Sequence, residues 1–149
     1  MLDALGLVPF CKTTGGKGLH LVTPLTAKGK AVSWEEAKGF AHDVCRAMER
    51  DAPGKFLTKA SKAARTGKIY LDYLRNDRLS TAVAPLSPRG RPHAPVSMPV
   101  TWAQVKADLD PLRYTVRTVP KLLAKTKAWE GYDEGARPIA AAMKKLARV

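Results

Sequence analysis

Residues 8–25 read VPFCKTTGGKGLHLVTPL, and this stretch decides the fold. Val8 and Phe10 indicate a short strand, and the apolar residues of 19–25 indicate a second one. Between them, three glycines fall within the four residues 15–18. Glycine permits tight turns and a close approach of the backbone to another group. The stretch therefore predicts two strands joined by a tight glycine loop.

The clearest helix follows, from Trp34 to about Arg50. Ser33 and Glu36 have the spacing of a reciprocal capping box, and Pro53-Gly54 ends the helix. We expect an apolar face at three- and four-residue steps, made of Trp34, Ala37, Ala41, Val44, Cys45 and Met48. On that face Cys45 is expected to act as a small hydrophobic residue rather than a reactive thiol.

The rest of the chain predicts further short elements. Strands are expected over Lys68–Leu74, Thr81–Ala84 and Val96–Met98, and helices over Trp102–Ala107, Lys121–Ala124 and Glu134–Ala147. The order is β-β-α-β-β-β with trailing helices, and we find no internal repeat. This order indicates an α+β fold on a mostly antiparallel sheet, with residues 1–149 forming a single domain.

The charge, the apolar runs and the cysteine count limit which partners and which compartment are expected. The chain has 149 residues, and Lys+Arg total 26 against 13 Asp+Glu, a net charge of +13. Such a balance favours a polyanionic partner, either nucleic acid or an acidic surface. No apolar run approaches the ~20 residues of a membrane helix, and two cysteines are too few for a disulfide framework, which favours a reducing cytoplasm.

Basic residues concentrate between Gly54 and Arg91, where only Asp72 and Asp77 oppose them. Such a segment either faces an anion or is a solvated surface. Asp72 itself stands in the apolar run Ile69–Leu74, where an unpaired carboxylate is costly. The cation that compensates its charge is either a metal ion or Arg75, and the sequence does not decide between the two.

Besides the segment around Asp72, the glycine loop is a candidate site. Backbone N–H groups converging in a glycine-rich turn suit phosphate oxygens, and Lys17 adds a positive charge. The spacing is not that of a Walker A loop. The alternative for the loop is an ordinary hairpin turn. The alternative for His20 is a partly buried histidine whose hydrogen bonds are satisfied within the protein.

Three separated motifs together carry a family resemblance: KTTGGKGLH at 12–20, GKIYLDYLRN at 67–76, and TAVAPLSPRGRPHAPVSMPVTW at 81–102. In this order they resemble the polymerase domain of bacterial DNA ligase D, of the archaeo-eukaryotic primase superfamily, which serves non-homologous end joining. The resemblance runs from Leu2 to near Trp129. It implies an RRM-like, mostly antiparallel sheet flanked by helices, and nucleotidyl transfer to DNA 3′ ends as the parent activity.

The resemblance also implies site residues. Thr14, where the family commonly has serine, Lys17 and His20 would contact the triphosphate of the incoming nucleotide. The basic residues Arg65, Arg75 and Arg89 would surround the same phosphates. Asp72 would be the catalytic metal ligand, for manganese or magnesium.

One departure matters. The family carries two more metal-binding aspartates in a D-x-D motif upstream of the glycine loop, and this sequence begins after that point. We therefore expect the C-terminal portion of an incomplete primase-type domain, inactive by itself. Asp108 and Asp110 have the same D-x-D spacing, but they lie far downstream of the glycine loop, and we interpret them as surface residues at a helix end.

The implied partners are DNA ends, nucleoside triphosphates, Ku and the ligase domain of the same polypeptide, with no membrane and a cytoplasmic, nucleoid-associated location. The alternative is a non-catalytic nucleotide- or nucleic-acid-binding module.

Overall fold

The computed structural model describes residues 1–26 and 31–148. The chain divides into two compact units. The first comprises 1–7, 25–82 and 137–149, and the second comprises 8–24 and 83–136. Each unit has its own apolar core. That residues 1–149 act as a single domain stays a prediction.

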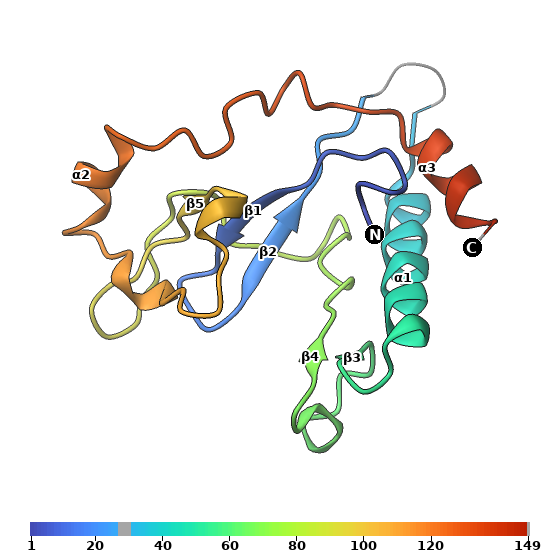
Figure 1. Cartoon of the computed structure of the whole chain (residues 1–149), viewed down its shortest axis with the longest axis horizontal. Coiled ribbons are helices and arrows are strands. Elements are labelled where there is room, and N and C mark those ends of the chain that lie inside the picture. The colour runs from blue at the N-terminus through green and yellow to red at the C-terminus, as the bar shows by residue number, and fades with distance from the viewer. Residues whose placement is uncertain (27–30, 149) are drawn as a thin grey trace. The chain divides into compact units, whose positions relative to one another are not determined.

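The second unit is built on a three-stranded sheet of order β2-β1-β5, with both pairs antiparallel (Figure 1). The strands are β1 (Phe10–Thr13), β2 (Leu19–Val22) and β5 (Pro99–Val100). The first two form the predicted strand pair around the glycine loop, and the predicted α+β class with an antiparallel sheet is confirmed. The core of this unit contains Cys11, Val96, Met98, Val100, Tyr114 and Val119.

Short helical turns complete the second unit: η2 (Trp102–Gln104), η3 (Pro111–Arg113) and α2 (Val119–Leu123). The first is shorter than the predicted helix to Ala107, and the last includes Pro120 in its first turn, where a missing N–H costs nothing. Asp110 caps η3 by accepting from the Leu112 N–H at 2.9 Å, as expected of a helix-end residue.

Two strand predictions between residues 81 and 98 were wrong. The backbone at 81–84 has no strand geometry, and the predicted strand Val96–Met98 is displaced to Pro99–Val100. Val96 N–H donates to the Tyr114 carbonyl and Ser97 N–H to the Ser87 carbonyl, both outside the sheet, and within 96–98 only the Met98 carbonyl accepts from the backbone of β1, at Thr13 N–H. Pro99 does not stop the strand because β5 lies at an edge of the sheet, where proline is tolerated.

The first unit contains α1 (Trp34–Asp51), β3 (Phe56–Leu57), η1 (Ala63–Arg65), β4 (Ile69–Tyr70) and α3 (Ile139–Leu146). Figure 1 shows α1 beside α3, and β3 pairs with β4 in parallel. The capping box is confirmed, with Glu36 N–H donating to Ser33 Oγ at 3.1 Å and Ser33 N–H to Glu36 Oε2 at 2.9 Å. The unpredicted β3 is too short to give a periodic signal.

The predicted apolar face of α1 was wrong in part. Trp34 is 58% exposed, and the buried residues are Phe40, Val44 and Ala47. The buried side of α1 differs from the predicted one because α1 packs on α3 and on the N-terminal residues of the same unit. The core here is Leu5, Leu7, Phe40, Val44, Ile139 and Ala142.

The last helix begins at Ile139, five residues after the predicted start. Pro138 is its N-cap, and the residue before a proline is disfavoured in helical geometry. Among the described residues, no helix combines the length and the apolar character needed to cross a membrane.

Candidate functional site

The loop between β1 and β2 is closed by Thr14. Both its N–H, at 3.2 Å, and its Oγ1, at 3.0 Å, donate to the Gly18 carbonyl oxygen. Gly15 has a φ of +65°, a conformation that glycine adopts without penalty. The loop is thus a tight turn that presents Lys17 on the surface.

Two arginines from far along the chain lie against this loop. Arg89 Nη1 donates to the Thr14 carbonyl oxygen at 3.0 Å. A Cβ on Gly15 would lie 2.6 Å from Arg89 Cγ, and one on Gly16 would lie 3.2 Å from Arg91 Nη1. The glycines therefore permit guanidinium groups to approach the loop backbone closely. This arrangement concentrates positive charge on one turn.

His20 lies on β2 directly opposite Lys12 of β1. The Lys12 Nζ is 3.1 Å from His20 Nδ1. Burial lowers the pKa of Lys12, and the nearby Arg89 lowers it further. Sequence reasoning missed Lys12, although counting outward from the glycine loop along both strands pairs it with His20.

The other predicted residues lie in the first unit. Asp72 follows β4 in a loop, and its side chain is 38% exposed. The predicted strand over Lys68–Leu74 forms only as β4 (Ile69–Tyr70), and the expectation that Asp72 is buried in it was wrong. Pairing stops after the Leu71 N–H bonds to the Leu57 carbonyl, because the partner strand β3 has only two residues.

Both oxygens of Asp72 have protein partners. Oδ1 accepts from the Leu74 N–H at 3.1 Å, and Oδ2 lies 3.5 Å from Arg75 Nε. The compensating cation is therefore Arg75, one of the two alternatives. Arg75 also donates from Nη1 to the Thr81 carbonyl oxygen at 2.9 Å.

Asp72 by itself does not fit a metal centre. A divalent cation such as magnesium takes about six oxygen ligands, and Asp72 offers one carboxylate, which already accepts from the Leu74 N–H and pairs with Arg75. Within residues 1–26 and 31–148, no group of three or more His, Cys, Asp or Glu side chains is placed to hold a metal.

Arg65 stacks on an aromatic ring rather than standing free. Its guanidinium carbon lies 3.8 Å from the centroid of Tyr70, and its Nη2 donates to the Ala60 carbonyl at 2.8 Å. Its Nε is buried without a hydrogen-bond partner among the described residues. A phosphate-binding role for Arg65 stays a prediction.

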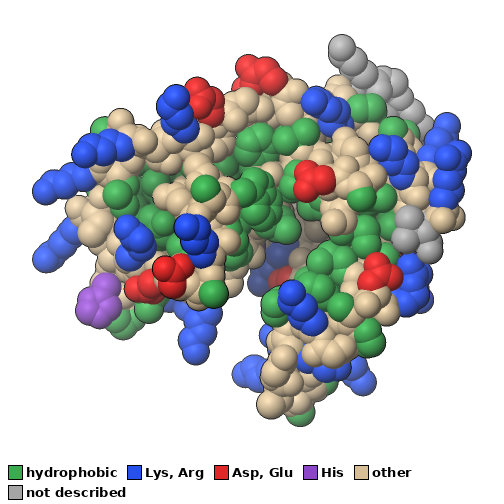
Figure 2. Space-filling model, in the orientation of Figure 1, with side chains coloured by type: hydrophobic (Ala, Val, Ile, Leu, Met, Phe, Trp, Pro, Cys, Tyr) green, Lys and Arg blue, Asp and Glu red, His purple; other side chains and the backbone are tan. Residues whose placement is uncertain are grey.

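The structure thus divides the predicted set between the two units. Thr14, Lys17, His20 and Arg89 lie on or beside the glycine loop in the second unit, and Arg65, Asp72 and Arg75 lie around β4 in the first. Figure 2 shows that lysine and arginine side chains outnumber acidic ones on the visible face.

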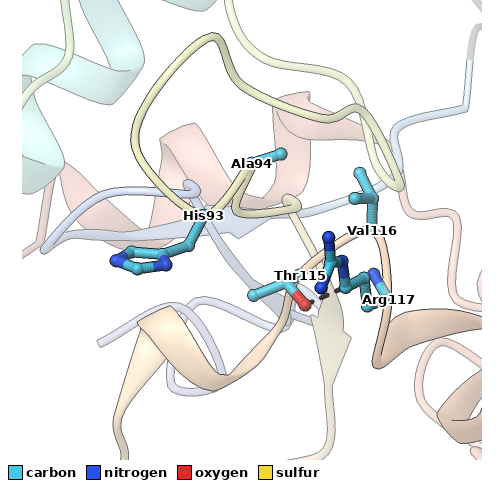
Figure 3. Close-up of a pocket in the computed structure, with 5 residues that line it drawn as sticks. All are labelled: His93, Ala94, Thr115, Val116 and Arg117. Carbon is cyan, nitrogen blue, oxygen red and sulfur yellow. Dashed lines mark hydrogen bonds between the residues drawn. The ribbon is translucent and has the colours of Figure 1, made fainter.

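A pocket of about 470 Å³ lies elsewhere in the second unit. Figure 3 shows its lining, which comprises His93, Ala94, Thr115, Val116 and Arg117. The Val116 N–H donates to the Ala94 carbonyl oxygen at 3.1 Å across it. His93 and Ala94 belong to the third motif, but none of the predicted site residues lines this pocket, so we do not place the site there.

Comparison with known proteins now defines the class. The model of the LigD primase-polymerase domain matches residues 1–129, so the chain belongs to this family. Members of the family are nucleotidyltransferases that generally need a divalent metal.

Three relatives show the extent of the similarity. The multifunctional non-homologous end joining protein LigD of Pseudomonas aeruginosa is 36% identical over 148 residues, 97% of this chain and 17% of that protein. The bifunctional LigD of Bacillus subtilis is 32% identical over 80% of this chain and 19% of that protein. A solved structure, the polymerase domain of Mycobacterium tuberculosis ligase D in complex with DNA, is 34% identical with a TM-score of 0.77 and covers 91% of this chain and 46% of that one.

Proposed function

We propose that the chain is part of a DNA-end repair polymerase of the non-homologous end joining type. In this proposal the loop between β1 and β2 holds the triphosphate of an incoming nucleotide. The observation that carries the proposal is the contact of Arg89 with the Thr14 carbonyl, which brings a guanidinium onto a glycine-rich turn. Family membership over residues 1–129 supports the reaction class.

The chemistry suits phosphate. Guanidinium and ammonium groups form charge-assisted hydrogen bonds with phosphate oxygens, stronger than those between neutral groups. Lys17 extends from the loop, and Arg89 and Arg91 lie beside its glycines. In this proposal Thr14, Lys17, His20 and Arg89 bind and orient the triphosphate. A phosphate-binding role for Arg65 and Arg75 is proposed from the family resemblance.

The net charge of +13 supports DNA as the second substrate. We propose DNA ends, Ku and a ligase domain as partners. The M. tuberculosis polymerase domain was solved with DNA, and the relatives are multifunctional end-joining proteins, which supports DNA ends and a ligase domain. Ku is proposed from the family resemblance. We also propose a cytoplasmic, nucleoid-associated location. The proposal assigns no step to a metal at Asp72 in this chain, because a single carboxylate that is already paired with Arg75 does not hold a divalent metal by itself.

A second candidate is a non-catalytic nucleotide- or nucleic-acid-binding module. The Asp72–Arg75 pair favours it, since a paired carboxylate in a loop serves structure without any metal. Primer extension separates the two candidates, because both bind nucleotide and only a polymerase extends a primer.

An NMR titration with magnesium ATP tests the binding site. We expect shifts at Thr14, Lys17, His20 and Arg89, together with Arg65 and Arg75. Lys17→Ala removes one charge-assisted contact and is expected to weaken binding by about 1.5 kcal/mol. Lys106→Ala, an exposed lysine of the same unit, is the matched control and should bind like the parent. Shifts confined to α3 would contradict the assignment.

A further inference from the structure

The segment between β3 and β4 carries a cation at every third residue from Lys59 onward. Lys62, Arg65 and Lys68 follow at this step, and residues 52–71 contain no aspartate or glutamate. The three lysines are exposed, and in the part of the chain that the structure describes none of them has an ion pair with a carboxylate. Cations gathered without counter-ions repel one another, so such a segment favours a polyanion.

Backbone hydrogen bonds fix this segment into two successive turns. The Arg65 N–H donates to the Lys62 carbonyl oxygen at 3.2 Å, and the Lys68 N–H donates to the Arg65 carbonyl oxygen at 3.0 Å. Thr66 and Gly67 occupy the middle of the second turn, and Gly67 supplies the positive φ, +73°, that a type II turn requires there. Lys62 and Lys68 are therefore each held one turn away from Arg65.

Arg65 ties these turns to the strands. Its guanidinium carbon lies 3.8 Å from the ring centroid of Tyr70 in β4, and its Nη2 donates to the Ala60 carbonyl oxygen at 2.8 Å. The parallel pair β3–β4 closes the segment, with the Ile69 N–H donating to the Lys55 carbonyl oxygen at 2.8 Å. A loop that is ordered before it binds loses less conformational entropy on binding. The segment is thus suited to presenting its lysines to a ligand.

The residues of 58–68, TKASKAARTGK, indicate which polyanion fits. They include no aromatic side chain on which a base could stack, and their only apolar side chains are those of alanines. A surface that inserts into a membrane interface carries larger apolar side chains. Lysines without such neighbours suit the phosphates of a nucleic acid backbone. Figure 2 shows lysine and arginine side chains around the end of the first unit where β3 and β4 lie.

We propose that Lys59, Lys62 and Lys68 form a basic patch that binds the backbone phosphates of duplex DNA. The inference rests on the proposed function for DNA as the partner and adds where the backbone is held. Phosphate contacts carry no sequence information, so the patch would bind DNA of any sequence. It is distinct from the glycine loop, which belongs to the second unit and is proposed for the triphosphate.

The test compares two triple variants of equal net charge. The patch variant is Lys59→Gln, Lys62→Gln and Lys68→Gln. The matched control is Lys121→Gln, Lys125→Gln and Lys127→Gln, which neutralises three exposed lysines of the second unit. Because both variants lose three charges, any difference between them reports where the DNA lies and not how much charge the protein carries.

Fluorescence anisotropy with a labelled duplex gives the slope of log affinity against log salt. The patch variant should have a slope shallower than that of the parent by about one for each lysine, and two unrelated duplex sequences should give the same change. The control should keep a slope close to that of the parent. Equal slopes in the two triple variants would overturn the inference.

Binding of magnesium ATP separates the patch from the triphosphate site. The patch variant should bind magnesium ATP like the parent, and weaker binding would place the lysines at the triphosphate and overturn the inference. A parent that binds magnesium ATP but no duplex would overturn the patch and leave the proposed nucleotide site standing. The expected slopes without any binding of magnesium ATP would support the patch and count against the proposed function.

Vesicles of phosphatidylcholine and phosphatidylserine test the other polyanionic surface. We expect the parent and the patch variant to bind them equally. A patch variant that loses binding to these vesicles but keeps the parent's slope with DNA would assign the lysines to a membrane surface and overturn the inference.

Discussion

Arg89 Nη1 donates to the carbonyl oxygen of Thr14 at 3.0 Å, although the two residues are 75 positions apart in the chain. This bond joins the glycine loop to the segment that follows Ala82. It is compatible only with a residue at position 15 that has no side chain, because a Cβ there would lie 2.6 Å from Arg89 Cγ. The loop and the arginine therefore depend on each other.

Gly15→Ala is expected to destabilise the protein. Gly15 has a φ of +65°, and holding another L-residue in the left-handed region costs about 1–2 kcal/mol before any clash with Arg89. Urea unfolding measures the loss. Gly90→Ala is the control, because its Cβ would meet nothing within 4 Å and its φ is not positive. Equal stability of the two variants would contradict the close approach of Arg89 to the loop.

DNA binding is expected to be weak, independent of sequence and steeply dependent on salt. The net charge of +13 implies binding through phosphates, which releases counterions. Fluorescence anisotropy with labelled duplexes between about 50 and 200 mM salt gives the slope of log affinity against log salt. Two unrelated duplex sequences should give the same slope. An affinity that stays flat over this range would refute the prediction.

Asp72→Asn is expected to have little effect in the 149-residue chain. The side chain is 38% exposed, and losing its pair with Arg75 should change the free energy of unfolding by at most about 0.5 kcal/mol. We expect no manganese-dependent primer extension by either protein, because two-metal catalysis needs several carboxylates and the resemblance assigns only Asp72.

The same substitution should abolish extension in a longer protein that carries an upstream D-x-D strand. Extension by the 149-residue chain that is lost in Asp72→Asn would contradict this expectation. It would also make Asp108 and Asp110 candidates for the missing ligands.

The two cysteines are expected to resist alkylation in the folded protein. Burial raises the pKa of the Cys11 and Cys45 thiols from their usual 9.0 to about 11, with Lys12 opposing the shift at Cys11 and Asp72 adding to it at Cys45. The reactive thiolate is therefore about a hundredfold scarcer than in the unfolded chain at pH 8. Iodoacetamide labelling followed by mass spectrometry should modify both only after denaturation.

The same shifts predict a loss of stability in alkali. Below pH 9 both thiols are protonated in the folded and the unfolded state, so stability is unaffected. Between pH 9 and about 11 only the unfolded state releases these protons, which favours unfolding. Replacing both cysteines by alanine should flatten the alkaline part of the stability curve, and an unchanged slope would argue against the shifts.

Local chemistry made part of this protein predictable from sequence. The capping box at Ser33 and Glu36 starts α1 as expected, because both bonds are made within four residues. The strands around the glycine loop also form where the apolar pattern places them, although β1 begins at Phe10 and β2 ends at Val22. The three motifs were sufficient to predict the family that residues 1–129 match.

Tertiary structure decided what depends on residues far apart in the chain. Asp72 stands in an apolar run but lies exposed, because the strand before it can extend only as far as its two-residue partner. Lys12 looks like a surface lysine, yet Val83 and Ser97 enclose its ammonium group from 71 and 85 positions away. Hydrogen bonds of this kind leave no periodic trace in sequence, since burial is set by whichever segments the fold brings together.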